Sequence, residues 1–368
     1  MSAALDAGFW RGRRVFVTGH TGFKGAWLAL WLHRLGAVVS GYALAPATRP
    51  SLFALARLHE WVESTTGDVR DAGALAAALA RARPEVVFHL AAQALVRPSY
   101  VDPVGTYATN VMGTVHLLEA VRRSGGTRAL VCVTSDKCYA PRADDRAHEE
   151  GDAMGGHDPY SASKGCAELV AGSYRDASCP AAGYRRHGLA LATARAGNVI
   201  GGGDWSPERL LPDLFAAADT GHRVQIRRPD AIRPWQHVLD ALHGYLLLAQ
   251  RLSEQGPAWA GAWNFGPDPV DARSVREVAE LLGRHLPLAC VFASAPEGPH
   301  ESASLRLDST RARRLLGWRP HWDVEQAIVE TAHWHLAHRH GADARAVCIE
   351  QIDRHQRASH QEGSRWAA

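Results

Sequence analysis

Short segments that are apolar throughout alternate with longer segments of helical periodicity as far as about residue 201. The strand-like segments are residues 13–19, 37–44, 85–92, 128–135 and 188–201. The helix-like segments between them are residues 24–36, 71–84, 103–125 and 159–177. Strands that lack polar alternation are typical of a parallel sheet covered by helices on both faces. The pattern therefore predicts an α/β fold built on a doubly wound parallel sheet.

Beyond residue 201 the pattern loosens into loops that contain proline and arginine, with shorter elements between them. From about Thr331 the chain is rich in histidine and arginine. A region of this kind usually supplies a substrate pocket and does not form an independent core. We therefore expect the second half of the chain to bind substrate beside the sheet.

Composition narrows the class of protein. The chain has 368 residues, 46% of them hydrophobic, and a formal net charge of +3 without a basic block. These values predict a globular protein of one large unit or two coupled domains, and they argue against nucleic acid as a partner. No apolar run approaches the roughly 20 residues that span a bilayer, and no secretory signal is seen. The six cysteines have no metal-ligand spacing, so we expect free thiols, no metal site and a cytoplasmic location.

A glycine-rich turn follows the first predicted strand. The stretch TGHTGFKG places Gly19, Gly22 and Gly25 between this strand and the first helix. In that context the glycines permit a tight turn, and the helix N-terminus offers amide groups to a pyrophosphate. The segment therefore predicts a dinucleotide-binding loop.

Two further residues bear on the cofactor. Asp68 follows a probable strand and suits a hydrogen bond to an adenine amine; the alternative is a helix N-cap, a role that Asp71 also suits. The second strand ends without the acidic residue that would bind a ribose 2′-hydroxyl, and Arg49 nearby would attract a 2′-phosphate. The spacing alone leaves NAD and NADP open.

A tyrosine and a lysine form the second chemical signal. Tyr160 and Lys164 are four residues apart, so they share one face of the predicted helix. A lysine cation beside a phenol stabilises the phenolate, which lets tyrosine act as a base. Thr134 and Ser135 end the preceding strand.

With these motifs the chain resembles the extended short-chain dehydrogenase/reductase family over nearly its whole length. The resemblance implies an NAD-binding Rossmann domain over residues 9–199, with added segments from about 230–268, a smaller α/β substrate-binding domain mainly over residues 200–340, and a tail over residues 341–368. It also implies a nucleotide-sugar substrate, NAD and a homodimer. The cofactor contacts that it implies are Gly19, Thr21, Gly22, Phe23, Lys24, Gly25, Asp68, Val69, Leu90, Ala91, Ala92, Asn110, Thr134, Tyr160 and Lys164.

The stretches SDKCY, GNVIGGGDW and RPWQHVLD resemble, more narrowly, nucleotide-sugar 4,6-dehydratases that act on CDP-glucose. The resemblance implies an internal redox cycle of deoxysugar and polysaccharide biosynthesis. In this cycle Tyr160 removes the 4-hydroxyl proton, Ser135 hydrogen-bonds the oxygen at carbon 4, and Asp136 and Lys137 eliminate water across carbons 5 and 6. Hydride leaves carbon 4 for the nicotinamide and returns to carbon 6.

Lysine is scarce in this chain, and its positions are informative. Among 41 Lys and Arg residues only Lys24, Lys137 and Lys164 are lysine. Arginine does not deprotonate in a protein, whereas a partly desolvated lysine exchanges a proton. We therefore favour proton transfer at Lys137; the alternative is a lysine that stays charged and sets the pKa of Asp136. Genomic base composition explains the scarcity of lysine but not where the three residues lie.

Candidate substrate contacts lie after the strand ends and in the second half. Arginine suits bidentate phosphate contacts, and an aromatic ring braces a base or a sugar. The candidates are Arg97, Asn198, Arg209, Arg233 and Trp235, and for Trp205 a binding role and a structural role are both open. The histidines at positions 333, 335, 338 and 340 are interpreted as a solvated helix face.

Three alternatives stay open at this point. A nucleotide-sugar 4-epimerase shares the tyrosine, the lysine and the glycine loop but needs no Asp136–Lys137 pair. A dehydratase for a dTDP, GDP or UDP sugar keeps the same mechanism; the inverting UDP-N-acetylglucosamine dehydratases, which also use Asp-Lys, lack the tyrosine seen here. A non-catalytic, dinucleotide-sensing regulator would typically have lost Tyr160 or Lys164.

Overall fold

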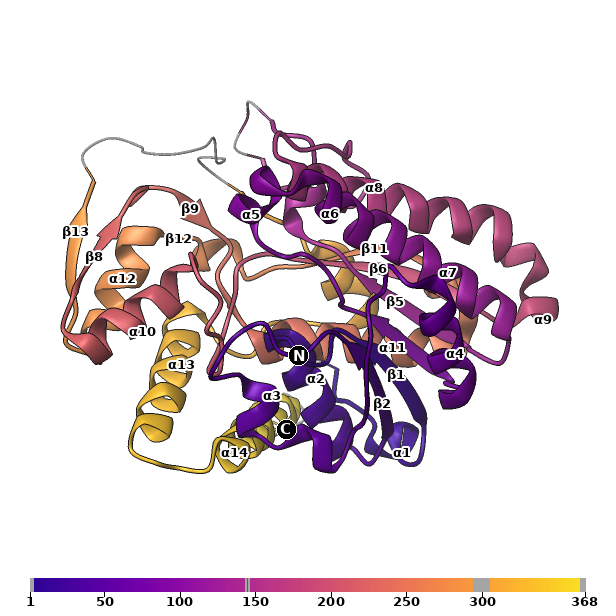
Figure 1. Cartoon of the computed structure of the whole chain (residues 1–368), viewed down its shortest axis with the longest axis horizontal. Coiled ribbons are helices and arrows are strands. Elements are labelled where there is room, and N and C mark those ends of the chain that lie inside the picture. The colour runs from indigo at the N-terminus through magenta and orange to yellow at the C-terminus, as the bar shows by residue number, and fades with distance from the viewer. Residues whose placement is uncertain (1–2, 143, 145, 294–304, 365–368) are drawn as a thin grey trace.

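The computed structural model describes residues 3–142, 144, 146–293 and 305–364. At its centre is a seven-stranded sheet in the order β11-β6-β5-β4-β1-β2-β3, with parallel pairing throughout (Figure 1). Its strands are β1 (Arg14–Thr18), β2 (Val38–Ala43), β3 (Glu63–Thr66), β4 (Val86–His89), β5 (Ala129–Val133), β6 (Ala190–Ala196) and β11 (Gly261–Phe265). The strand order reverses between β1 and β4, and doubly wound sheets bind ligands at such a switch point, at the carboxyl ends of the strands.

Helices cover both faces of this sheet. Successive residues of β1 point to opposite faces, so Val15 and Val17 join one apolar core and Phe16 joins the other. The first core contains α1 (Ala7–Trp10), α2 (Phe23–Arg34), α3 (Leu52–Leu55), α11 (Val238–Gln255) and α14 (Ala344–Ser364). The second contains α4 (Ala72–Ala82), α7 (Gly113–Ser124) and α8 (Pro159–Ser173). The predicted α/β fold with a doubly wound parallel sheet is confirmed.

Two predicted elements are more divided than the sequence pattern indicates. The helix expected over residues 103–125 is α6 (Pro103–Tyr107) and α7, joined by a π-helical turn at Ala108–Met112. The strand expected over residues 188–201 is β6 followed by β7 (Val199–Ile200), which pairs with β10 (Gln236–His237) outside the main sheet. Gly197 lies between them, where a Cβ would come within 2.3 Å of Pro234, so the chain leaves the sheet at a close backbone approach.

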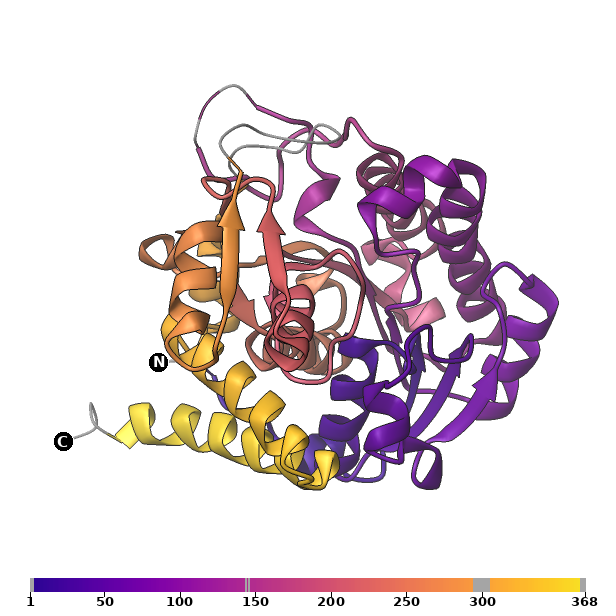
Figure 2. The same cartoon turned by 60° about the vertical axis from the view of Figure 1, so that its left-hand side comes forward.

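A smaller group of elements packs beside the carboxyl ends of the strands. It contains α10 (Leu210–Thr220), β8 (Arg223–Ile226), α12 (Val275–Gly283), β13 (Ala289–Phe292) and α13 (Val324–Arg339), around a core of its own. Strands β8 and β13 run parallel (Figure 2), and β9 (Ile232–Arg233) pairs antiparallel with β12 (Arg273–Ser274). The short helices α5 (Val96–Val101) and α9 (Tyr184–His187) complete the α-helices of the described ranges.

The C-terminal helix α14 belongs to the core of the sheet domain. Its His355 donates a 2.8 Å hydrogen bond from Nε2 to Asp240 Oδ1 of α11, and its ring meets Trp31 of α2 edge-on at 5.4 Å. Arg34 of α2 donates to Asp353 at 3.1 Å. The last helix of the chain therefore packs against the first long one.

The expectation of a solvated histidine face on α13 is wrong for His335. Its ring stacks on Phe215 of α10 at 4.2 Å, and its Nε2 lies 3.1 Å from Asp219. His335 is buried because α13 closes the smaller core, whereas His333 and His340 are exposed. Among the described residues no cluster of His, Cys, Asp and Glu is arranged to hold a metal ion.

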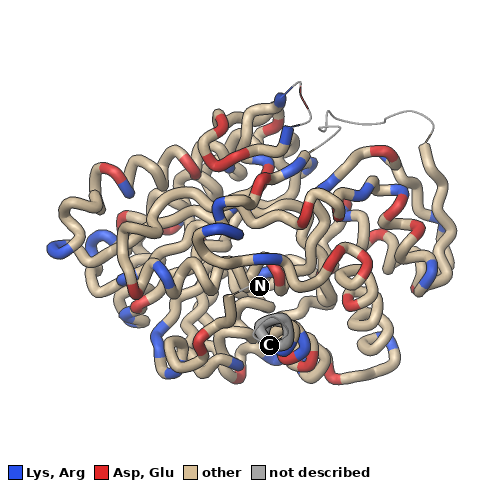
Figure 3. The backbone as a smooth tube through the Cα atoms, turned by 180° about the vertical axis from the view of Figure 1, so that it is seen from behind, with Lys and Arg blue, Asp and Glu red and all other residues tan. Residues whose placement is uncertain are grey.

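Three further features concern the surface and the thiols. Figure 3 shows Lys and Arg interspersed with Asp and Glu over the face in view. All six cysteines are free thiols, and four of them are buried. Within the described ranges, no helix has both the length and the apolar character needed to cross a membrane.

Candidate active site

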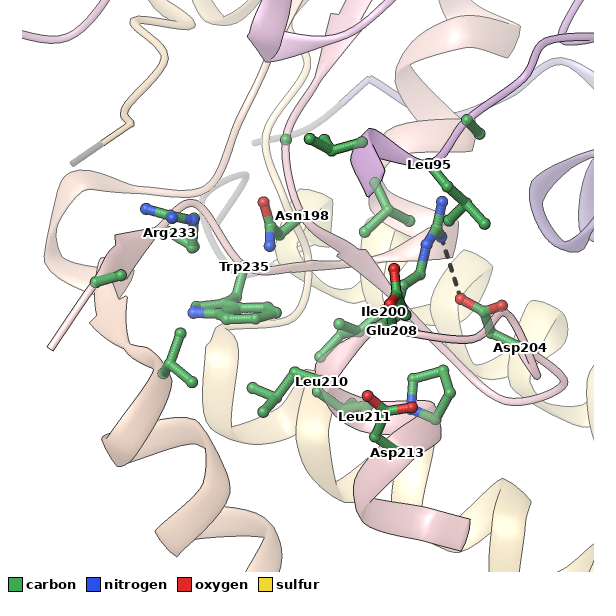
Figure 4. A pocket seen from close by; sticks show the side chains of 18 of the residues that line it. Leu95, Asn198, Ile200, Asp204, Glu208, Leu210, Leu211, Asp213, Arg233 and Trp235 are labelled. Atoms are coloured by element: carbon green, nitrogen blue, oxygen red, sulfur yellow. Dashed lines mark hydrogen bonds and ion pairs between the residues drawn. The ribbon is translucent and has the colours of Figure 1, made fainter. Parts of the chain in front are cut away.

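A cavity of about 310 Å³ lies between the carboxyl ends of the central strands and the smaller group of elements (Figure 4). Its wall on the sheet side includes Lys24, Thr134, Ser135, Asp136, Lys137 and Tyr160. All five predicted substrate contacts line it as well: Arg97, Asn198, Arg209, Arg233 and Trp235. The structure thus brings together residues that lie more than 200 positions apart in the chain.

The glycine loop packs as a dinucleotide loop requires. Gly19 has φ of +77°, and a Cβ there would lie 2.7 Å from the Ala91 amide nitrogen. A Cβ on Gly25 would lie 2.1 Å from the Gly19 carbonyl oxygen, so only glycine fits at either position. Helix α2 begins at Phe23 with Gly22 as an N-cap that offers no side chain. The helix N-terminus therefore remains available to an anion, and these residues fit the pyrophosphate of a nicotinamide dinucleotide.

Two loop residues differ in where their side chains go. Thr21 donates its hydroxyl hydrogen bond to the Leu44 carbonyl oxygen at 2.8 Å. Lys24 reaches the cavity, where burial and the charges of Arg209 and Lys164 lower its pKa to about 8. The sequence assigned Lys24 to the cofactor loop, and its contact with the substrate cavity was missed.

Other predicted cofactor residues lie along the strand ends. The amide nitrogens of Leu90 and Ala91 each donate to the Thr18 hydroxyl at 3.2 Å, which fixes the turn after β4 beside the glycine loop. Ala92 continues that turn and is half-buried. Val69 is buried against Gly113 of α7.

Asp68 and Asp71 divide the roles that the sequence left open. Asp71 caps α4 by accepting a 2.9 Å hydrogen bond from the Ala74 amide. Asp68 accepts from the Arg70 backbone at 2.8 Å and from its guanidinium at 2.6 Å, and these hydrogen bonds lower the pKa of Asp68. The N-cap role therefore belongs to Asp71. Arg49, the candidate for a 2′-phosphate, is exposed in the loop after β2.

Asn110 acts as a brace at the π-helical turn. Its Oδ1 accepts from the Gln93 amide at 2.8 Å, and its Nδ2 donates to the Ser163 hydroxyl at 2.8 Å. The side chain therefore joins the loop after β4 to α8, which carries Tyr160 and Lys164. The Asn110 side chain therefore helps to hold α8, and with it Tyr160 and Lys164, beside the loop after β4.

Thr134 and Ser135 have different partners, although they are adjacent. The Thr134 hydroxyl points into the protein and donates to Glu168 at 2.5 Å. The Ser135 hydroxyl donates to Asp136 Oδ1 at 3.0 Å and shares a hydrogen bond with the Tyr160 phenol. This geometry favours Ser135 over Thr134 as the residue that faces a substrate oxygen.

Tyr160 and Lys164 are both buried on α8. Burial raises the pKa of the Tyr160 phenol to about 12, an effect that the hydrogen bond with Ser135 opposes only in part. Burial lowers the pKa of Lys164 to about 8, and its Nζ donates to the Val133 carbonyl oxygen at 3.4 Å. Lys164 is absent from the residues that line the cavity, so it stands behind the tyrosine at the end of β5.

Asp136 is the buried acid of the cavity. Its Oδ2 is buried and has no hydrogen-bond partner among the described residues, and a Cβ on Gly197 would come within 3.1 Å of that oxygen. Burial raises the pKa of Asp136, while the nearby cations Lys137, Arg233 and Lys24 oppose that rise. A carboxyl group that is desolvated, partly unpaired and directed at a cavity is suited to donate a proton.

Lys137 is half-buried and lies in the 3₁₀ turn Asp136–Cys138. The Ser135 hydroxyl caps this turn by accepting from the Lys137 amide at 3.2 Å. The same serine therefore fixes Asp136, Lys137 and Tyr160 relative to one another.

The substrate-side residues form the opposite wall. Arg97 donates to Glu208 at 3.1 Å, and Arg209 donates to Asp204 at 3.2 Å. Figure 4 shows Arg233, Trp235 and Asn198 on the other side of the cavity. Trp235 is buried, and its Nε1 donates to the Arg273 carbonyl oxygen at 3.0 Å. Trp205 packs edge-on against Trp334 at 5.8 Å and is absent from the cavity lining.

Sequence reasoning missed the three carboxylates of this wall, Asp204, Glu208 and Asp213. No sequence pattern predicts that an acidic residue in a loop lines a cavity, because the arginine that neutralises it is brought close only by the fold. It also missed Glu168 and Arg195, a buried ion pair of 2.7 Å behind the strand ends.

The family model described as NAD dependent epimerase/dehydratase family matches residues 15–265, which hold the glycine loop, the Ser135–Lys137 turn and the Tyr160–Lys164 pair. The chain belongs to this family. A curated member, the CDP-glucose 4,6-dehydratase of Salmonella typhimurium, is 49% identical over 343 residues, covering 92% of this chain and 95% of the relative.

Solved structures of the epimerase/dehydratase family show the same fold. The dTDP-glucose 4,6-dehydratase from Streptomyces venezuelae, solved with NAD bound, has a TM-score of 0.72 at 24% identity and covers 90% of this chain and 99% of its own. The UDP-glucose 4-epimerase of Thermotoga maritima, solved with UDP-glucose, has a TM-score of 0.75 at 22% identity over 88% of this chain and 99% of its own. At these identities the likeness concerns the fold alone.

Proposed function

We propose that this chain is an NAD-dependent 4,6-dehydratase that converts CDP-D-glucose to CDP-4-dehydro-6-deoxy-D-glucose and water in deoxysugar and polysaccharide biosynthesis. The observation that carries the proposal is the 49% identity to a CDP-glucose 4,6-dehydratase over nearly the full length of both chains. The buried, partly unpaired Asp136 beside Tyr160 and Lys137 supports it, because an epimerase needs no such acid.

The glycine loop and the N-terminus of α2 would hold the NAD pyrophosphate, with Asp68 near the adenine and Lys164 at the nicotinamide end. NAD bound there would supply the redox chemistry, as acceptor of hydride from carbon 4 of the sugar and donor of hydride to carbon 6. Tyr160 removes the proton from the 4-hydroxyl group, and Ser135 donates a hydrogen bond to the oxygen at carbon 4. Because burial raises the pKa of Tyr160 to about 12, the phenol needs nearby positive charge to act as a base.

Asp136 and Lys137 carry out the elimination. Lys137 takes the proton from carbon 5, which the adjacent ketone at carbon 4 makes acidic. The carbon 6–oxygen bond breaks as Asp136 protonates the departing hydroxyl, so that water leaves and a carbon 5–carbon 6 double bond remains. When hydride adds at carbon 6, Lys137 returns its proton to carbon 5, which completes the product. The burial that raises the pKa of Asp136 keeps it available as an acid.

The smaller group of elements binds the nucleotide. Arg209 and Arg233 would contact the pyrophosphate, because both line the cavity and guanidinium groups match phosphate oxygens. Arg97, Asn198 and Trp235, which line the same cavity, would hold the sugar and the ribose. This proposal assigns residues 9–199, with segments from 230–268, to NAD and residues 200–340 mainly to the nucleotide sugar.

A homodimer is proposed from an apolar surface on neighbouring helices. Val101 of α5 is 87% exposed, Val104 of α6 is 79% exposed, and Leu169 of α8 is 64% exposed. These three helices lie side by side (Figure 1). Apolar side chains gathered in this way mark interaction sites. Light scattering should give twice the chain mass, and Leu169→Asp should give the monomer mass.

We place the protein in the cytoplasm because its six cysteines are unpaired, which fits a reducing compartment.

The test of function is to incubate the purified protein with CDP-glucose, with and without added NAD, and to measure the sugar product by mass spectrometry. Loss of one water without net NADH is the expected result. A new epimer of unchanged mass would assign a 4-epimerase instead. Water loss only from a dTDP, GDP or UDP sugar would keep the mechanism and overturn the nucleotide.

A further inference from the structure

Three carboxylates besides Asp136 line the cavity, and two of them are neutralised. Asp204 accepts from Arg209 at 3.2 Å, and Glu208 accepts from Arg97 at 3.1 Å. A nucleotide sugar carries two phosphate charges, so a carboxylate in its cavity must either be paired with a cation or lie where the ligand presents hydrogen-bond donors. The third carboxylate, Asp213, needs such an explanation.

Asp213 lies in the first turn of α10 and is half-buried. Burial raises the pKa of its carboxyl group, while a backbone hydrogen bond with Glu208 and the charge of Arg227 oppose that rise. Figure 4 shows Asp213 on α10 beside Leu210 and Leu211, across the cavity from Arg233 and Asn198. Gln225 and Arg227 line the cavity as well. Leucine side chains with a carboxylate acceptor next to them are suited to a flat heterocycle with a hydrogen-bond donor at its edge.

The pyrimidines differ at that edge. Cytosine carries an amino group at position 4, whereas uracil and thymine carry a carbonyl oxygen, and a carboxylate accepts from the amine but repels the carbonyl. We propose that Asp213 accepts a hydrogen bond from the cytosine amine and so selects cytidine over uridine and thymidine nucleotide sugars. The inference rests on the proposed CDP-glucose activity and names the residue that sets its nucleotide preference.

The experiment measures the binding of CMP, UMP and GMP by calorimetry for the unaltered protein and for Asp213→Asn and Asp213→Ala, alongside turnover of CDP-glucose and UDP-glucose. Asparagine keeps an acceptor and adds a donor for a carbonyl, so we expect the CMP-over-UMP preference to fall roughly tenfold to a hundredfold in Asp213→Asn. Asp213→Ala should weaken the binding of CMP without strengthening the binding of UMP. Asp219→Asn is the matched control, since it lies on the same helix outside the cavity lining and should keep the preference.

Binding and turnover separate the two proposals. A protein that prefers CMP through Asp213 but leaves CDP-glucose unchanged would support this inference and overturn the proposed reaction. UMP or GMP bound as tightly as CMP by the unaltered protein would overturn the inference, whatever the turnover. It is also overturned if Asp213→Asn melts like the unaltered protein and keeps its CMP preference.

Discussion

The two sides of the β5 strand end carry buried carboxylates with opposite surroundings. Behind the strand, Glu168 accepts from Thr134 at 2.5 Å, from Thr193 at 2.7 Å and from the Arg195 guanidinium at 2.7 Å. In front of it, Asp136 accepts one hydrogen bond from a side chain and has an oxygen without a partner among the described residues.

The difference separates a carboxylate with a structural role from one that is suited to a chemical role. A buried carboxylate that is paired and fully hydrogen-bonded holds its neighbours in place, whereas one left partly unpaired in a cavity is held for a ligand. Both residues are buried and acidic, and only their partners distinguish them.

Asp136→Asn should reduce the rate of water loss by about 10²- to 10⁴-fold, the usual contribution of a general acid. Asparagine has a similar shape and cannot donate a carboxyl proton. The fold should be unaffected, because the change removes an ionisable group from a buried position. Product mass spectrometry gives the rate, and thermal unfolding gives the stability; a variant that dehydrates at full rate contradicts the assignment.

The same residue predicts the direction of a pH effect. Burial raises the pKa of Asp136 above its unfolded value, so its acid form and its contribution to stability are both present at low pH and are lost as pH rises through that raised pKa. Asp136→Asn should remove this loss of stability with rising pH, which is measured as the free energy of unfolding at a series of pH values.

Glu168→Gln should lower the free energy of unfolding by about 3–5 kcal/mol, because it leaves the buried Arg195 without its counter-charge. Denaturant unfolding measures the loss. Glu350→Gln is the control, since Glu350 is exposed on α14 and lies 3.9 Å from its arginine partner. Equal stability in the two variants would show that the region behind the strand is not the structural anchor.

Lys137→Arg keeps the charge near Asp136 but removes a residue that can lose a proton. If Lys137 takes the carbon-5 proton, water loss should fall about 100-fold, the lower range for a general base. Exchange of deuterium from solvent into carbon 5, followed by mass spectrometry, should fall with it. Full turnover by the arginine variant would leave Lys137 only the role of setting the pKa of Asp136.

The smallest effects concern Asp71 and Asp68, three residues apart. Asp71→Ala removes the N-cap of α4 and should lower stability by about 1 kcal/mol without changing NAD affinity. Asp68→Ala removes a surface ion pair and should change stability by less than about 1 kcal/mol, while weakening NAD binding. Denaturation and NAD titration of both variants test this division; weaker NAD binding by Asp71→Ala alone would reverse it.

The functional residues on the sheet side of the cavity could be predicted from the sequence because their motifs are local. The glycine loop, the Ser135–Lys137 turn and the pair at Tyr160 and Lys164 each lie within a few residues of a strand or on one helix turn. The parallel arrangement of the strands then brings these segments to one edge.

The other wall was less predictable. Its arginines were recognised singly, but their pairing with Asp204 and Glu208 depends on how loops fold back over the sheet. His335 was misjudged for the same reason, since its burial arises from the packing of α13 on α10 and not from its own helix. Lys24 was predicted to contact the cofactor from its position in the loop, and its side chain also lines the cavity, which the sequence did not indicate.

The contact between α14 and α2 has a consequence for synthesis of the protein. Helix α2 is made early, yet Trp31 and Arg34 on it find His355 and Asp353 only when the last helix emerges from the ribosome. Domains otherwise tend to fold during synthesis from the N-terminus onward. Completion of the glycine-loop domain therefore waits until α14 has been made, and a ribosome-stalled chain that lacks α14 should display an unfinished nucleotide-binding face to chaperones.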